Sequence, residues 1–331
     1  MSRLVPDEAA PPTGPVGQAP LPDAPPHPGL RHRIEQRVHR SGRRLVTAVP
    51  YLWLLLFFLL PFGIVLKIAL SEAAIARPPY SPLVEFLGDG VVQITVSLRN
   101  FGFILSDSLY TVAYLNSVKI AFVSTVIALI VGYPMAYAIA KAPRTWRGPL
   151  LMMIILPFWT SFLIRVYAWI GILNDTGLIN GLLTGLGLTD RPIQMIRTDF
   201  AVYVGIVYSY LPFMILPLYA TLERMDDSLV EAALDLGCRP WQAFVKVTLP
   251  LSLPGIVAGS LLVFIPAVGE FVIPELLGGP DTLMIGKILW QEFFNNRDWP
   301  VASAVAIALL LVLVLPIMAF QHFQSREAGG R

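Results

Sequence analysis

Six long apolar runs constrain this chain more than any other feature of its sequence. They lie at about 45–70, 112–140, 150–173, 201–222, 251–274 and 301–320; glycine and proline interrupt them, but charged residues are nearly absent. A bilayer core of about 30 Å needs roughly 20 apolar residues per helix, so each run is long enough to cross it. With 55% hydrophobic and 14% charged residues, the chain is too apolar for a soluble domain. The runs predict an all-α, polytopic membrane protein with six transmembrane helices.

Basic residues in the flanking segments predict the orientation of these helices. If the N-terminus is cytoplasmic, the inner segments after residue 30 hold fourteen Lys and Arg residues and the outer segments hold six. Lys and Arg resist transfer to the outer side of a membrane, so we expect both termini in the cytoplasm. The outer segments also carry eleven Asp and Glu residues, and this acidic balance mildly favours a cationic solute.

The chain divides by composition into a tail, a membrane domain and a short end. Residues 1–30 are rich in proline and alanine and predict a disordered tail, while residues 31–44 are basic and are expected to lie against anionic headgroups. Residues 45–323 form the expected transmembrane domain, and residues 324–331 a cytoplasmic tail.

Residues that would carry catalysis or bind a metal are missing from the sequence. Its single cysteine, Cys238, allows no intrachain disulfide, and the chain contains neither a phosphate-binding loop nor a Cys/His cluster with metal-ligand spacing. A membrane enzyme would have to use a residue such as Ser260 or Asp281, and neither lies in a motif with a base or a metal ligand. We therefore expect a protein that is not an enzyme and has no cofactor of its own.

The cytoplasmic segment at about 224–248, called here the coupling loop, has the signals of two short helices. Ser228 and Glu231 have the spacing of a capping box, Gly237 suits a left-handed helix end, and Pro240 suits the first turn of the next helix. Glu231 has two interpretations at this point. It is either only a helix cap or part of a contact with another protein.

The same segment resembles the cytoplasmic signature of the inner-membrane permeases of bacterial ABC importers. That signature is Glu-Ala-Ala, three residues, Gly, nine residues, Ile, one residue and Leu-Pro; every spacing matches, and only Val247 departs from it, in place of isoleucine. The resemblance implies a type I ABC importer permease fold in which the short helices dock into a cleft on a separate ATPase. It assigns docking to Glu231, Ala232, Ala233 and Gly237, with Leu249 and Pro250 completing the signature and Trp241 and Phe244 as candidate apolar contacts.

The fifth apolar run holds the best candidate for a solute path. Its prolines free backbone carbonyls, and Glu270 places a carboxylate inside the apolar stretch. An intramembrane carboxylate is costly to insert, so it is expected to face the interior of the bundle and to have a partner. Two interpretations stay open: a structural pair with Lys119 or Arg165, or a counter-ion for a cationic cargo.

Aromatic residues of the third and fourth runs extend this candidate path. Trp159, Tyr167 and Trp169 lie in the third run, and Tyr208 lies in the fourth between Tyr203 and Tyr210. Ring faces attract cations, so these side chains are candidates for a cation-binding surface. Packing is the alternative, since aromatic clusters in helices commonly fill a core.

Three further stretches narrow the resemblance to the polyamine permeases. Residues 158–169 and 268–279 are similar to that group, and residues 295–304 are most similar to its putrescine members; the resemblance covers residues 45–323. It implies an inner-membrane subunit that pairs with a second, homologous permease and an ABC ATPase dimer, which binds the ATP and Mg. It further implies that a soluble periplasmic binding protein delivers the cargo, most specifically putrescine, and it implies no nucleic-acid partner.

Two alternatives remain at this stage. The permease could take spermidine or another small cation. A secondary carrier driven by protons or sodium would instead use Glu270 as its coupling acid, but six helices without an evident inverted repeat make that less natural. The Glu231 signature also opposes it, because a carrier of that kind needs no ATPase dock.

Overall fold

The computed structural model describes residues 46–86 and 92–329. It separates into two parts, Met1–Pro61 and Phe62–Arg331, and each is described by itself. The predicted tail at 1–44 lies outside the described residues. Within the first part the chain is helical from residue 46 and includes a π-helical turn, η1 (Leu55–Leu59). Its large apolar side chains are exposed, as membrane-facing side chains are expected to be.

The second part begins within helix α2 and includes a small β-hairpin. Helix α2 (Leu60–Ala69) completes the apolar helical segment Val46–Ala69, and a loop leads to the antiparallel strands β1 (Val84–Phe86) and β2 (Val92–Ile94). Helix α3 (Arg99–Ser106) follows. The hairpin is a local exception to the all-α prediction, because these few residues lie between helices and outside the apolar runs.

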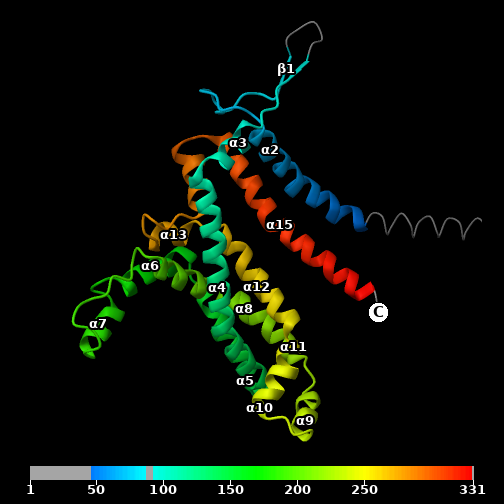
Figure 1. Ribbon diagram of the computed structural model, residues 1–331, viewed down its shortest axis with the longest axis vertical. Helices are drawn as coiled ribbons and strands as arrows, with labels where there is room; N and C mark the ends of the chain where they lie inside the picture. The colour runs from blue at the N-terminus through cyan, green and yellow to red at the C-terminus, as the bar shows by residue number, and fades with distance from the viewer. Residues whose placement is uncertain (1–45, 87–91, 330–331) are drawn as a thin grey trace, which may run out of the picture. The chain divides into compact units, whose positions relative to one another are not determined.

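Three long helices form the centre of the second part. Helices α4 (Ser108–Lys141), α8 (Asp199–Glu223) and α12 (Leu253–Val268) pack against one another, as Figure 1 shows. Small side chains permit this close approach: Ala128 and Ala136 of α4 are fully buried, and a Cβ on Gly259 of α12 would lie 2.9 Å from Met214 Sδ of α8. Close-packed small residues are the usual means by which membrane helices associate.

The predicted third span is not one continuous helix. The chain forms α5 (Arg144–Ile155), a 3-10 turn η2 (Leu156–Trp159), α6 (Phe162–Leu173) and α7 (Leu178–Gly185). Thr160 and Ser161 between η2 and α6 have extended backbone angles, with ψ of 153° and 139°. Pro157 contributes to this break because it has no N–H to donate to the preceding turn.

The predicted fifth span is also broken. The coupling loop contains α9 (Ser228–Asp235), α10 (Pro240–Ala243) and the π-helical turn η3 (Phe244–Thr248), and α11 (Leu249–Leu251) and α12 follow it. The helix stops at Val268, and the chain restarts as α13 (Val272–Leu277) and α14 (Ile285–Trp290). A π-helical turn, η4 (Gln291–Asn295), leads to the last helix, α15 (Trp299–Gly329), which continues through most of the predicted C-terminal tail.

The number of candidate spans among the described residues is smaller than the predicted six. Four helical segments are long and apolar enough: Val46–Ala69, Ser108–Lys141, Phe162–Gly185 and Asp199–Glu223. A fifth exists if Pro240–Leu251 and Leu253–Val268, which meet at a bend of 63°, form one span. The apolar part of the last helix, Trp299–Val314, is shorter. A helical membrane architecture is therefore confirmed, whereas six spans and the orientation of the termini stay predictions.

Candidate functional site

The coupling loop begins with a capped helix. Asp226 Oδ1 accepts a hydrogen bond of 3.0 Å from the Ser228 N–H, so Asp226 caps the start of α9. This hydrogen bond lowers the pKa of the Asp226 carboxyl, because it stabilises the charged form. The predicted capping box of Ser228 and Glu231 is wrong, since Ser228 lies inside the first turn and no side chain forms that box.

Gly237 ends α9 in the predicted left-handed conformation, with φ of +86°. The Gly237 N–H donates to Leu234 O at 2.9 Å, and the Cys238 N–H donates to Ala233 O at 3.0 Å. This pair of bonds is the Schellman arrangement, which needs a residue at positive φ and therefore favours glycine. Pro240 then opens α10, as predicted. The two short helices are thus joined by a sharp and well-defined turn.

Contacts with α4 hold the coupling loop in place. Lys141 at the end of α4 forms an ion pair with Asp227 at the start of α9. Phe244 turns inward, with its ring edge-on to Tyr133 at 5.6 Å and to Tyr137 at 6.0 Å between ring centroids. The Tyr133 hydroxyl lies 2.9 Å from Ser252 Oγ in a buried hydrogen bond. The loop is therefore attached to α4 by charge and by ring packing, and Ser252, just after the loop, is attached by a hydrogen bond.

A second brace joins α5 to α8 beside the loop. Arg147 Nη1 lies 3.3 Å from Glu223 Oε1 at the end of α8, and Arg147 Nε donates to Ala142 O at 2.9 Å. Figure 1 shows α9 and α10 near α5, at the end of α4 that is far from α3.

Most of the predicted docking residues face outward. Glu231, Ala232 and Gly237 are exposed, Ala233 is half-buried, and Trp241 is 61% exposed. Leu236, which the sequence analysis did not single out, is 86% exposed beside them. Leu249 is half-buried against the helices and Pro250 is exposed, so these two residues lie at the base of the loop.

The second site is built around Glu270, which lies where α12 stops. Its side chain is buried, with only 7% of the residue exposed. Glu270 Oε1 accepts hydrogen bonds from the N–H groups of Phe271, Val272 and Ile273 at 3.1, 3.0 and 3.4 Å. The carboxylate thus satisfies the free N–H groups at the start of α13, in the manner of a helix cap.

The other oxygen of the carboxylate has a side-chain partner. Glu270 Oε2 accepts a short hydrogen bond from the Tyr210 hydroxyl of α8. The predicted structural partners were Lys119 and Arg165, and neither forms an ion pair with Glu270 in the described structure. That interpretation is corrected: among the described residues, Glu270 forms no ion pair, and backbone N–H groups and a tyrosine hydroxyl are its hydrogen-bond partners. No sequence signal links position 210 to position 270, because the contact depends on how α8 packs on α13.

Arg165 lies at the end of a series of rings that starts at Tyr210. Tyr210 and Phe213 are 6.2 Å apart, and Phe213 and Phe158 are 5.4 Å apart, between ring centroids. The Arg165 guanidinium lies 4.6 Å from the centroid of the Phe158 ring and 5.7 Å from that of Phe162. Its Nε and Nη1 atoms are enclosed without a hydrogen-bond acceptor in the described structure, so ring faces supply its observed electrostatic contacts.

The described hydrogen bonds of Glu270 involve none of the four aromatic residues predicted for the path. Trp159 and Tyr167 are 73% and 56% exposed on the outside of the broken third run. Trp169 and Tyr208 pack against each other, with ring centroids 5.4 Å apart. The ring that contacts the carboxylate is Tyr210, which the sequence analysis noted only as one of three tyrosines.

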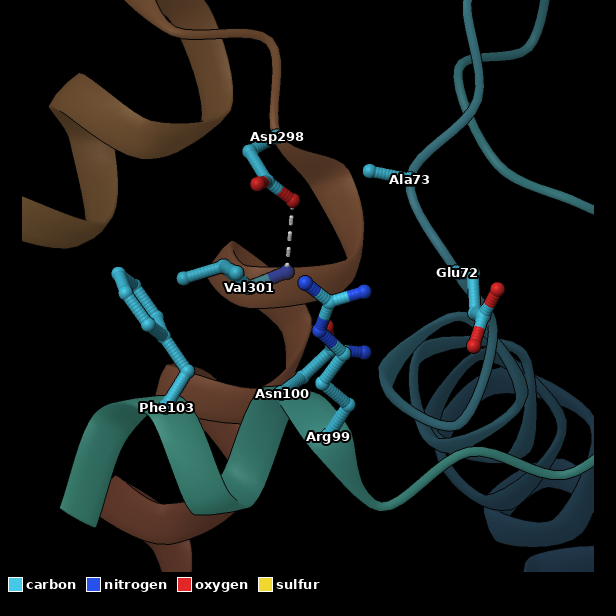
Figure 2. A pocket seen from close by; sticks show the side chains of 7 residues that line it. All are labelled: Glu72, Ala73, Arg99, Asn100, Phe103, Asp298 and Val301. Atoms are coloured by element: carbon cyan, nitrogen blue, oxygen red, sulfur yellow. Dashed lines mark hydrogen bonds between the residues drawn. The ribbon is translucent and has the colours of Figure 1, made fainter. Parts of the chain in front are cut away.

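A polar pocket lies where α2, α3 and the start of α15 meet (Figure 2). It has a volume of about 280 Å³, and its lining residues are Glu72, Ala73, Arg99, Asn100, Phe103, Asp298 and Val301. Figure 2 shows the Arg99 guanidinium extending between the Glu72 and Asp298 carboxylates. The buried Asn100 amide donates 2.8 Å hydrogen bonds to Ala69 O and Ser71 O and so ties α3 to the end of α2. The mixed charges of this pocket oppose a simple cation site.

Comparison with known proteins identifies the family. Residues 33–327 match the family described as "Binding-protein-dependent transport system inner membrane component". The spermidine/putrescine transport system permease protein PotB of Haemophilus influenzae is 36% identical over 294 residues, which are 89% of this chain and 97% of that protein. PotB of Escherichia coli is 42% identical over 229 residues, which are 69% of this chain and 83% of that protein.

Solved structures of low sequence identity share the fold. A bacterial ABC transporter for the import of the acidic polysaccharide alginate contains a chain with a TM-score of 0.65 and 16% identity, covering 89% of this chain and 99% of that one. The same type of transporter, in complex with an alginate pentasaccharide-bound periplasmic protein, gives a TM-score of 0.66 at 16% identity, with 89% and 98% coverage. The ABC importer permease fold predicted from the coupling loop is confirmed.

The family match settles several predictions. It confirms a multi-helix transport subunit of the inner membrane that is not an enzyme, and it confirms dependence on a binding protein. The narrower prediction, a putrescine permease, is not supported, because the relatives named here carry both spermidine and putrescine in their names. The chain belongs to the family of binding-protein-dependent transport system inner membrane components.

Proposed function

We propose that this chain is the permease subunit of an ATP-driven importer for polyamines, with spermidine favoured over putrescine as cargo. Two relatives that are 36% and 42% identical to it bear the name spermidine/putrescine permease, and this observation carries the choice of cargo. The acidic outer segments and the buried Glu270 are consistent with a cationic solute. A second, homologous permease and an ATPase dimer complete the proposed transporter.

The exposed surface of the coupling loop supports docking of the ATPase there. Leu229, Leu234, Leu236 and Trp241 are each at least 40% exposed, although they lie outside the apolar spans. Four exposed apolar side chains next to the charged Glu231 suit a helix that binds in a groove of another protein. The small side chains of Ala232 and Ala233 would let the helix backbone approach that groove closely.

The attachment of the loop to α4 supports its proposed role in transmitting movement. An ATPase that moves α9 would also move Asp227 and Phe244, which contact Lys141, Tyr133 and Tyr137 of α4. Because α4 packs on α8 and α12, the displacement would reach the central bundle. ATP binding is proposed to close the ATPases and open the bundle outward, and hydrolysis to reset it.

The proposal includes six spans with both termini in the cytoplasm. The native Cys238 allows this orientation to be tested without introducing a cysteine. We expect a membrane-impermeant maleimide to label Cys238 in inside-out vesicles and to leave it unlabelled in intact spheroplasts. The double variant Cys238→Ser/Asp190→Cys should show the reverse pattern, because Asp190 is exposed in the loop before α8. Labelling of Cys238 from outside would contradict the orientation.

The cargo is tested by uptake into vesicles that hold the chain with its partner subunits and binding protein. We expect saturable, ATP-dependent uptake of radiolabelled spermidine, with putrescine competing and a neutral amino acid not competing. If the vesicles instead take up putrescine in an ATP-dependent way, do not take up spermidine, and are not inhibited by it, the narrower prediction of a putrescine permease would be restored. An active ATPase complex without uptake of either amine would remove polyamines as the cargo.

Glu231→Lys tests the docking assignment. We expect normal amounts of the variant in the membrane, because Glu231 is exposed and caps nothing, and at least about tenfold slower uptake, because a reversed charge within a protein contact costs about 1.4 kcal/mol or more. Co-purification of the ATPase should fall in parallel. Asp190→Lys, the same charge change outside the coupling loop, is the control. Wild-type uptake by Glu231→Lys would refute docking through this residue.

Glu270→Gln tests the buried carboxylate. We expect uptake of a cationic cargo to fall about tenfold, equivalent to about 1.4 kcal/mol, while basal ATPase activity changes little. Tyr210→Phe is the matched control, because it removes the hydroxyl partner and keeps the negative charge. If both variants lose uptake equally, the hydrogen bond matters and the charge does not; if Glu270→Gln retains full uptake, Glu270 has only a structural role.

A further inference from the structure

Arg165 is a buried cation within an apolar run. The six runs hold three cationic side chains, Lys67, Lys119 and Arg165, against a single carboxylate, Glu270. Lys67 and Lys119 are exposed, so their long side chains can bend toward a membrane surface. Arg165 is only 9% exposed and is enclosed by other side chains. The function proposed above gives this guanidinium no role.

The contacts of Arg165 inside the chain do not compensate its charge. Two of its nitrogens, Nε and Nη1, are enclosed and have no hydrogen-bond acceptor in the described structure. The ring centroids of Phe158 and Phe162 lie 4.6 and 5.7 Å from the guanidinium carbon. A ring face stabilises a cation by less than the loss of its hydration costs, so the guanidinium still needs an anion.

The one carboxylate within the runs is already engaged elsewhere. Glu270 Oε1 accepts three backbone N–H groups, and Oε2 accepts the Tyr210 hydroxyl. The ion pairs among the described residues do not include one between Glu270 and Arg165. An anion for Arg165 therefore has to come from outside this chain.

Lipid phosphates are poorly placed to supply that anion. Arg165 is the fourth residue of α6, and the eight residues from Val166 to Leu173 that follow it span about 12 Å at 1.5 Å per residue. On the other side, residues 150–164 of the same run carry no charge. An enclosed guanidinium cannot extend over such a distance. At this depth, the anion that a protein can offer is a carboxylate on a neighbouring helix.

Part of the guanidinium is reachable from outside the chain. Nη2 is not among the enclosed nitrogens. Phe213 of α8, whose ring centroid lies 5.4 Å from that of Phe158, is 38% exposed, and Leu163 and Ile164 beside Arg165 are 48% and 65% exposed. If another helix covered these apolar side chains, they would exclude water from an ion pair formed at Arg165.

From these observations we infer that Arg165 is a contact residue for the second permease, and that its ligand there is an aspartate or glutamate carboxylate within an apolar span. A charge-assisted pair in this low-dielectric setting is strong and directional, so it would fix how the two permeases face each other. The inference rests on the proposed two-permease transporter, and it concerns the contact between the subunits rather than the cargo.

The test replaces the guanidinium by an amine in the full chain, held with its partner subunits in nanodiscs. In Arg165→Lys, dicyclohexylcarbodiimide, which enters membranes, adds to a nearby carboxyl group; the amine then attacks the activated carbonyl, an amide bond forms and the urea leaves. This bond requires the two groups to be in contact, and mass spectrometry of the digested product identifies both residues. The parent protein is the control, because its guanidinium does not form such an amide.

We expect an amide between position 165 and an Asp or Glu in an apolar span of the second permease, and no link at position 165 in the parent. A link from position 165 to Glu270, or to any other carboxylate of this chain, would overturn the inference. The absence of a link would also overturn it, because water or lipid would then be the partner of Arg165.

Arg165→Gln measures the same contact without a reagent. We expect the amount of second permease that co-purifies with this variant to fall at least about fivefold, because a carboxylate is left unpaired in the membrane, whereas Arg165→Lys should retain most of it. Changing the linked carboxylate to its amide should cause a similar loss alone and restore assembly when combined with Arg165→Gln. Two losses that simply add would refute the pair.

The cross-link does not depend on transport, so it separates the contact from the cargo. If the linked position is found but the parent complex takes up no polyamine, the contact stands and the proposed cargo is rejected. If the parent complex takes up spermidine but position 165 forms no link to the second permease, the proposed function stands and the contact is rejected.

Discussion

The buried carboxylate of Glu270 fixes the path of the chain after α12. It accepts three backbone N–H groups at the start of α13 and the Tyr210 hydroxyl of α8, so the end of one helix, the start of the next and a neighbour are held at one point. Close packing reinforces this point: a Cβ on Gly286 would lie 2.5 Å from Gly269 O and 2.6 Å from Glu270 O. A buried charge without such partners would be strongly destabilising, so the break in the fifth apolar run and the carboxylate depend on each other.

The coupling loop and the Glu270 site lie on the same packed helices. The loop contacts α4 through Phe244 and Asp227, and α4 and α12 both pack on α8, which supplies Tyr210. The elements between α9 and the carboxylate are therefore packed against one another, with an ion pair, ring contacts and a hydrogen bond among them. Packed helices of this kind can carry coupling between two distant sites, which gives the proposed importer a structural basis for linking ATPase movement to cargo movement.

Sequence reasoning succeeded where a position needs one particular residue type and failed where several neighbouring residues could have the same role. Gly237 and Pro240 were placed correctly because a left-handed helix end and a first helical turn each need one particular residue type. The capping box was assigned wrongly because Asp226, Asp227 and Ser228 are all good caps, and only hydrogen-bond geometry shows that Asp226 has that role. Trp159 and Tyr167, which the sequence predicts for the solute path, are 73% and 56% exposed in the single chain, and their place in a path stays a prediction.

Apolar composition and the spaced residues of the coupling loop determined from the sequence alone that this is a helical membrane protein with an ABC permease fold. Both signals act through residues that are near one another in the chain, where periodicity and spacing are directly readable. Tertiary structure alone decided that Tyr210 is the partner of Glu270 and that the Tyr133 hydroxyl is hydrogen-bonded to Ser252 Oγ. These two contacts join positions that are 60 and 119 residues apart, and the packing of helices, rather than any local preference, brings them together.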